Sequence, residues 1–181
     1  MPPAPEPPVP SPPPEVVPPP LAPAEVTAQT LFREADRARA AGNGALALRT
    51  LRMLVTRFPR DRSAAAARYE LAYMEHAADD PDAALGDLAA VDDPALDEPA
   101  RYLRCRVLAP RAPTAADRCF ADFRRQFPAS PHDADALATQ AALALAHGGC
   151  PAARAPLAEL ARRYPAHRSI VRLRASCREP P

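Results

Sequence analysis

Residues 45–59 read ALALRTLRMLVTRFP, residues 115–128 read AADRCFADFRRQFP, and residues 152–165 read AARAPLAELARRYP. Aligned on their final prolines, the three stretches share a small residue, two large apolar residues and an aromatic residue. These positions are Ala47, Ala116 and Ala153; Leu51, Phe120 and Leu157; Leu54, Phe123 and Leu160; and Phe58, Phe127 and Tyr164. A shorter copy, DAALGDLAAVDDP, ends at Pro94, so the four prolines are 35, 34 and 37 residues apart. Self-similarity at this period is typical of a repeat protein.

Within each copy the apolar positions are separated by three or four residues, which is the spacing of one face of an α-helix. We therefore expect an all-α chain with helices near 26–41, 44–57, 63–78, 81–90, 97–108, 114–126, 131–146, 150–163 and 167–177. Possible N-cap residues precede several of these segments. They are Asn43, Ser63, Asp80, Thr114 and Ser130.

The pattern resembles the tetratricopeptide repeat, in which a unit of about 34 residues forms two helices and ends in proline. The resemblance covers about residues 27–165 and implies an α-solenoid of about four helix-turn-helix repeats, closed by a C-terminal capping helix. The third unit departs from the pattern, because Arg104 stands where a small residue is expected. Units that end in Phe-Pro or Tyr-Pro are similar to those of bacterial envelope proteins of this family.

Residues 1–24 hold 13 of the 26 prolines. Proline removes a backbone donor and biases its predecessor away from helix, so we expect a disordered or polyproline II arm before a repeat domain at 25–181. A solvated spacer is one interpretation of this arm, and a ligand for a proline-binding module is the other.

The composition excludes several classes of function. A formal net charge of +1 gives no electrostatic reason for nucleic-acid binding. No apolar run approaches the roughly 20 residues of a membrane span, so we expect no direct membrane insertion. Only five glycines are present, and no phosphate-binding loop or catalytic motif is found. We expect no enzyme activity, no cofactor and no metal.

The four cysteines are Cys105, Cys119, Cys150 and Cys177. In the repeat that the resemblance implies, two residues on paired antiparallel helices lie at one level when their numbers average to the centre of the turn. This condition favours Cys105 with Cys119 and Cys150 with Cys177 over Cys119 with Cys150. Buried reduced thiols are the alternative, and a metal site that includes His147 is a third reading.

The first helices of tetratricopeptide units line a concave groove, and the resemblance places six candidate binding residues there. They are Arg33, Asp36 and Arg39 in the first unit and Tyr69, Tyr73 and His76 in the second. Aromatic residues and arginines are enriched at binding hot spots. The alternative is that both tyrosines only pack between helices.

These features predict a non-enzymatic scaffold that holds a protein or peptide partner within a bacterial envelope complex. The alternative is the sensory or regulatory ectodomain of a membrane-anchored, anti-sigma-like regulator. Paired disulfides favour a periplasmic or other extracytoplasmic location, with an anchor upstream of residue 1 because the sequence does not open with a signal peptide. A cytoplasmic location is the alternative.

Overall fold

The computed structural model describes residues 26–177, and this part of the chain is helical without any strand. The helices are α1 (Ala28–Ala40), α2 (Gly44–Arg57), α3 (Ser63–Ala77), α4 (Pro81–Ala89), α5 (Asp97–Leu108), α6 (Pro113–Gln126), α7 (Asp133–Arg163) and α8 (Ser169–Ser176), with a 3-10 turn, η1 (Pro94–Leu96), before α5. The all-α prediction is confirmed. The arm expected at 1–24 lies outside the described residues.

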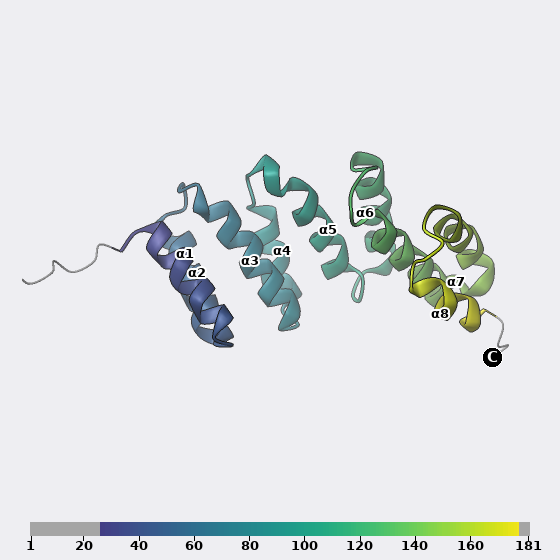
Figure 1. Ribbon diagram of the computed structural model, residues 1–181, viewed down its shortest axis with the longest axis horizontal. Helices are drawn as coiled ribbons and strands as arrows, with labels where there is room; N and C mark the ends of the chain where they lie inside the picture. The colour runs from purple at the N-terminus through teal and green to yellow at the C-terminus, as the bar shows by residue number, and fades with distance from the viewer. Residues whose placement is uncertain (1–25, 178–181) are drawn as a thin grey trace, which may run out of the picture.

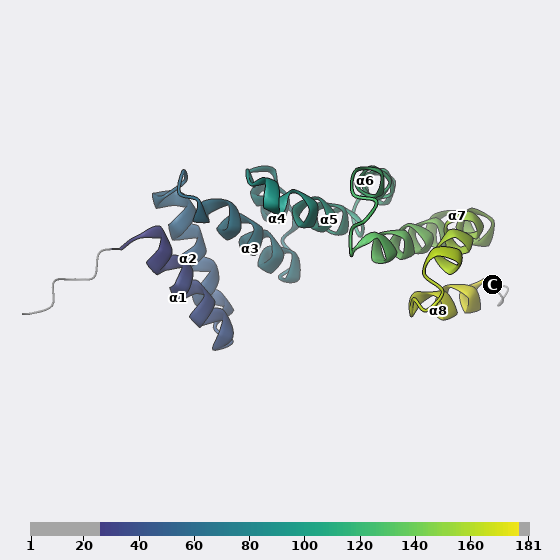
Figure 2. The same ribbon diagram turned by 45° about the horizontal axis from the view of Figure 1, so that its top comes forward.

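The helices form an elongated row, and α1 and α8 lie at its opposite ends (Figures 1 and 2). Each helix packs mainly on its neighbours in the chain, and α3 also contacts both α1 and α5. The apolar interior is consequently divided among four clusters along the row, centred on Leu54, Leu103, Phe120 and Leu160. Every cluster joins consecutive helices, so stability depends on local interfaces rather than on one central core.

Helix α7 covers two of the nine predicted helices. Its backbone is interrupted at Gly149, where φ is 66° and ψ is −166°. A positive φ of this kind favours glycine, and Pro151 follows in the first turn of the second half, where proline is tolerated. The predicted helices at 131–146 and 150–163 are therefore both present as halves of α7, although the first begins two residues later, at Asp133.

Three of the five predicted N-cap residues do not cap a helix in the structure. Asn43 and Asp80 do accept backbone hydrogen bonds from Leu46 and Ala83. Ser63 does not cap α3, because it is the first residue of that helix. Its own N–H is bound instead by the Asp61 carboxylate over 2.8 Å. Thr114 does not cap α6, which already begins at Pro113. Ser130 does not cap α7, because that helix begins at Asp133 after His132, and the Ser130 hydroxyl accepts the His132 N–H instead.

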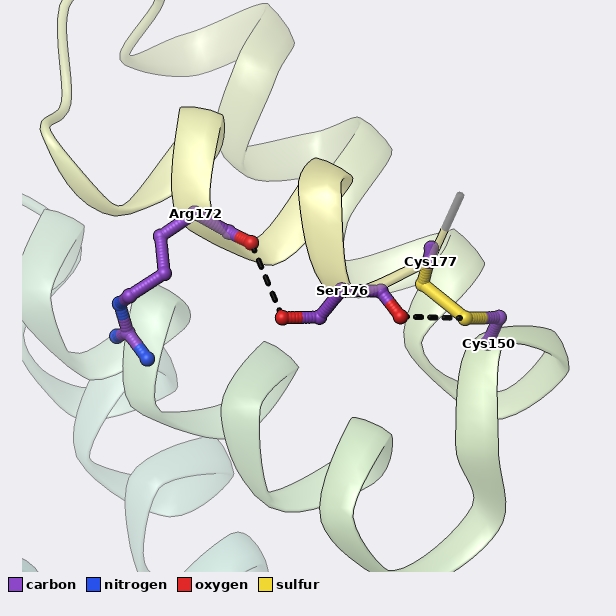
Figure 3. The surroundings of a disulfide bond; sticks show 4 residues. All are labelled: Cys150, Arg172, Ser176 and Cys177. Atoms are coloured by element: carbon purple, nitrogen blue, oxygen red, sulfur yellow. Dashed lines mark hydrogen bonds between the residues drawn. A yellow bond between two sulfur atoms is a disulfide. The ribbon is translucent and has the colours of Figure 1, made fainter. Parts of the chain in front are cut away.

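Two disulfides join helices that are adjacent in the row. Cys105 of α5 is bonded to Cys119 of α6, and Cys150 in the second half of α7 is bonded to Cys177 after α8. The Cα atoms are 5.3 Å apart in both pairs. Figure 3 shows the second pair, with the Ser176 carbonyl oxygen 3.8 Å from Cys150 Sγ and the Arg172 side chain directed away from the sulfurs. These are the two pairs that the turn-centre argument favours.

Candidate functional site

Ionisable side chains do not gather into a metal site within residues 26–177. The four histidines are dispersed: His76 is on α3, His147 is near the break in α7, and His167 contacts Asp135 over 3.1 Å. His132, just before α7, stacks on a tyrosine instead. The arrangement of aromatic and charged side chains on α3 and α5 is therefore the strongest candidate for a binding site.

Helix α3 carries Tyr69, Tyr73 and His76 at i, i+4 and i+7, which places them along one face of the helix. Tyr69 is half-buried against the apolar cluster that includes Ala72 and Leu103. The ring of Tyr73 remains 52% exposed. One tyrosine thus anchors this face in the interior while the next presents its ring to solvent.

Helix α5 carries a second such series, Glu98, Tyr102 and Arg106, at i, i+4 and i+8. The Tyr102 ring lies parallel to the His132 ring with a centroid separation of 4.2 Å. The Arg106 guanidinium lies 5.9 Å from the Tyr102 centroid, within cation–π range. Among residues 26–177, Arg106 forms no ion pair, although it is exposed.

The electrostatics connect the two helices. Burial raises the pKa of Tyr69, the charge of Glu98 raises it further, and Arg106 opposes the shift. Burial lowers the pKa of His76, and the positive charge of Arg106 lowers it further. Burial also raises the pKa of Tyr102, which Arg106 again opposes. Arg106 therefore acts on rings from both α3 and α5.

We call this surface the tyrosine face. It consists of Tyr69, Tyr73, His76, Glu98, Tyr102, Arg106 and His132.

The residues predicted on α1 have a different position. Arg39 pairs with Asp36 of its own helix over 3.3 Å, and Arg33 is exposed. The charged groups outside α3 that act on Tyr69 belong to α5, not to α1. Arg106 therefore acts on Tyr69 and His76, whereas a shared site of Arg33, Asp36 and Arg39 with the α3 residues stays a prediction.

The α5 residues were missed because the third unit is out of register by one residue. Arg104, at the position expected for a small residue, is exposed, and the neighbouring Cys105 is fully buried instead. Tyr102 precedes Cys105 by the same number of residues as Tyr69 precedes Ala72, so the two tyrosines occupy equivalent positions in their helices. The correct register could have been found from Cys105, a small apolar residue between Arg104 and Arg106, which is the buried residue at this point of the helix.

The opposite side of α5 borders two open hollows. One, of about 360 Å³, lies over the Cys105–Cys119 disulfide and is lined by Arg101, Arg104 and Arg118. The other, of about 530 Å³, is lined by acids that include Asp92 and Asp97. Arg101 lines both hollows, and its Nε donates to Asp97 over 2.6 Å. An arginine–aspartate ion pair therefore lies between them.

Two groups of buried charges hold neighbouring helices together. Asp133 accepts hydrogen bonds from Arg124 Nε over 2.8 Å and from the Tyr164 hydroxyl over 2.5 Å, and it forms an ion pair with Arg163 over 2.8 Å. Glu75 is 2% exposed and accepts from Arg52 over 2.9 Å, while its second oxygen has no hydrogen-bond partner.

Asp87 lies beside Glu75. Burial raises the pKa of the Asp87 carboxyl, and the charge of Glu75 raises it further. Arg68, whose guanidinium nitrogen lies 3.3 Å from the Asp87 carboxylate, opposes the shift.

Neither models of protein families nor curated proteins give a significant match to this chain. Within residues 26–177, every helix is too short or too polar to cross a lipid bilayer.

Proposed function

We propose that this chain is a non-enzymatic protein-interaction scaffold whose helix pairs form a tetratricopeptide-type solenoid, closed by α8. The proposal is supported by the proline-terminated repeat in the sequence and by the consecutive packing of the helices. Two disulfides favour an oxidising compartment, such as the periplasm of a bacterial envelope.

The tyrosine face is the site that we assign to a protein or peptide partner. The exposed ring of Tyr73 on α3 and the exposed, unpaired Arg106 on α5 carry this assignment. Tyrosine and arginine contribute strongly to interfaces. A tyrosine ring gains contact area at little entropic cost, and the planar arginine cation makes several directed hydrogen bonds. Among residues 26–177, the Tyr73 side chain makes no hydrogen bond and the Arg106 side chain makes neither a hydrogen bond nor an ion pair, so both are available to a partner.

Site-specific photocrosslinking tests this function. A photoreactive phenylalanine derivative at position 73 of the full chain, expressed in its native envelope, should capture a discrete partner protein. The same group at position 171 is the control, because Val171 is 78% exposed but lies on α8. Arg106→Gln should reduce the adduct formed at position 73. Identical adducts from both positions, or none from position 73, would refute the assignment.

A further inference from the structure

The rings of the tyrosine face are spaced across the row of helices as well as along each helix. Helix α3 contributes Tyr69 and Tyr73, α5 contributes Tyr102, and His132 lies at the start of α7. Helices α3 and α5 contact one another directly, and the axes of packed helices are about 8–10 Å apart. His132 stacks on Tyr102 at 4.2 Å and so belongs to the same group of rings. A ligand that crosses from α3 to α5 therefore meets a second group of rings after about 8–10 Å.

A polyproline II helix has the matching repeat. It advances about 3.1 Å per residue with three residues per turn, so the same side recurs about every 9 Å. An α-helix recurs about every 5.4 Å, and alternate residues of a strand about every 6.6 Å, so neither matches the helix spacing. Aromatic-lined surfaces bind polyproline II segments well because that conformation is already formed before binding.

Residues 1–24 of this chain contain 13 prolines, a composition that favours the polyproline II conformation. This segment directly precedes α1, which contacts α3. At about 3.1 Å per residue, 24 residues reach about 75 Å, which exceeds the roughly 20 Å across two helix spacings. Its charged side chains are Glu6 and Glu15, and both are acidic. They complement Arg106, which has no ion pair among residues 26–177.

We propose that the tyrosine face binds the proline-rich segment of residues 1–24 of this chain. Prolines pack against the rings of Tyr73 and Tyr102, and Arg106 pairs with a glutamate of the segment. This inference rests on the binding role proposed for the same face, and it makes the segment a competitor of any other partner there.

The test uses a full-length chain in which glycine and serine replace the 13 prolines of residues 1–24, so that its own segment no longer competes. A synthetic peptide of residues 1–24 is titrated into this chain, and the tyrosine ring resonances are followed by NMR. We expect a saturable shift of Tyr73 and Tyr102. Tyr73→Ala and Arg106→Gln should each weaken binding at least tenfold.

Arg104→Gln is the matched control, because Arg104 is on the same helix but borders the hollow on its opposite side. This change should leave the affinity unaltered, and a peptide with glycine and serine in place of proline should not bind. The proposal is overturned if the natural peptide gives no saturable shift at millimolar concentration. It is equally overturned if Arg104→Gln and Arg106→Gln weaken binding to the same extent.

This peptide-binding test can fail while the proposed scaffold function still holds. If a partner is captured from position 73 but the peptide does not bind, only the assignment of residues 1–24 fails. If the peptide does bind, dilution of the natural chain shows whether the segment that occupies the face belongs to the same molecule or to a second copy. Ring shifts independent of concentration mean that it comes from the same molecule, and concentration-dependent shifts mean that it comes from a second copy.

Discussion

Asp133, at the start of α7, accepts a 2.8 Å hydrogen bond from Arg124 Nε of α6 while its own side chain is only 1% exposed. Because Arg163 and Tyr164 bind the same carboxylate, one residue connects α6 with both halves of α7. Removing one member of a buried ion pair leaves the remaining charges unpaired in a poorly solvated site.

Asp133→Ala should therefore lower the free energy of unfolding by about 3 kcal/mol or more. Urea denaturation followed by circular dichroism measures this loss. Asp122→Ala is the control, because Asp122 pairs with Arg125 on the exposed surface of α6, where the loss should be below about 0.5–1 kcal/mol. Equal losses in the two variants would show that Asp133 does not connect the helices.

Glu159 should make the fold sensitive to acid. Hydrogen bonds from Arg124, and further contributions from Arg163, hold the pKa of this carboxyl below its usual value of 4.5. The unfolded chain therefore binds more protons than the folded chain in this range, and the stabilisation is complete above pH 4.5 and lost as the pH falls through the folded pKa. On acidification, the free energy of unfolding of the Glu159→Gln variant should fall less than that of the natural chain. Glu34→Gln is the control, because Glu34 lies at an exposed position of α1, and this variant should behave like the natural chain.

Asp87 should have the opposite effect. Its folded pKa is raised above 3.8 by burial and by Glu75, so the folded chain holds the proton more tightly than the unfolded chain. Its contribution to stability is complete below pH 3.8 and is lost as the pH rises through the folded pKa. Asp87→Asn should therefore gain stability relative to the natural chain as the pH increases from acid toward neutral. Parallel stability curves for the two chains would contradict this expectation.

Each disulfide should stabilise the folded chain independently of the other. The double change Cys105→Ser with Cys119→Ser should cost about 3 kcal/mol, and the corresponding change at Cys150 and Cys177 slightly more, because it closes the longer loop. Non-reducing peptide mass mapping should show the same two pairs. A peptide that links Cys119 to Cys150 would contradict both the pairing and the helix arrangement on which it depends.

Much of the helical structure could be predicted because α2, α6 and the second half of α7 end in the same apolar-to-proline pattern. The register of α5 could not, because the preceding copy is shorter and is followed by the 3-10 turn Pro94–Leu96. A one-residue difference there exchanges Arg104 for Cys105 in the interior.

The candidate site was predictable only on one helix. The sequence shows that Tyr69 and Tyr73 lie one helical turn apart. Their neighbours, however, depend on which helix packs against that face of α3. Tyr69 contacts the cluster that contains Leu103 of α5, and Arg106 of α5 acts on its hydroxyl, which the spacing within α3 does not indicate. Sequence spacing defines a helix face, whereas tertiary packing decides which neighbour that face meets.

The positions of the disulfides make the chain mechanically asymmetric. Both lie between residues 105 and 177, and their cysteines are separated by 14 and 27 residues. At up to about 3.6 Å per residue, the two loops withhold about 50 Å and about 97 Å of contour length when the chain is pulled from its ends. Under tension, the half that contains α1 to α4 would extend completely, while the other half would reach full length only after reduction.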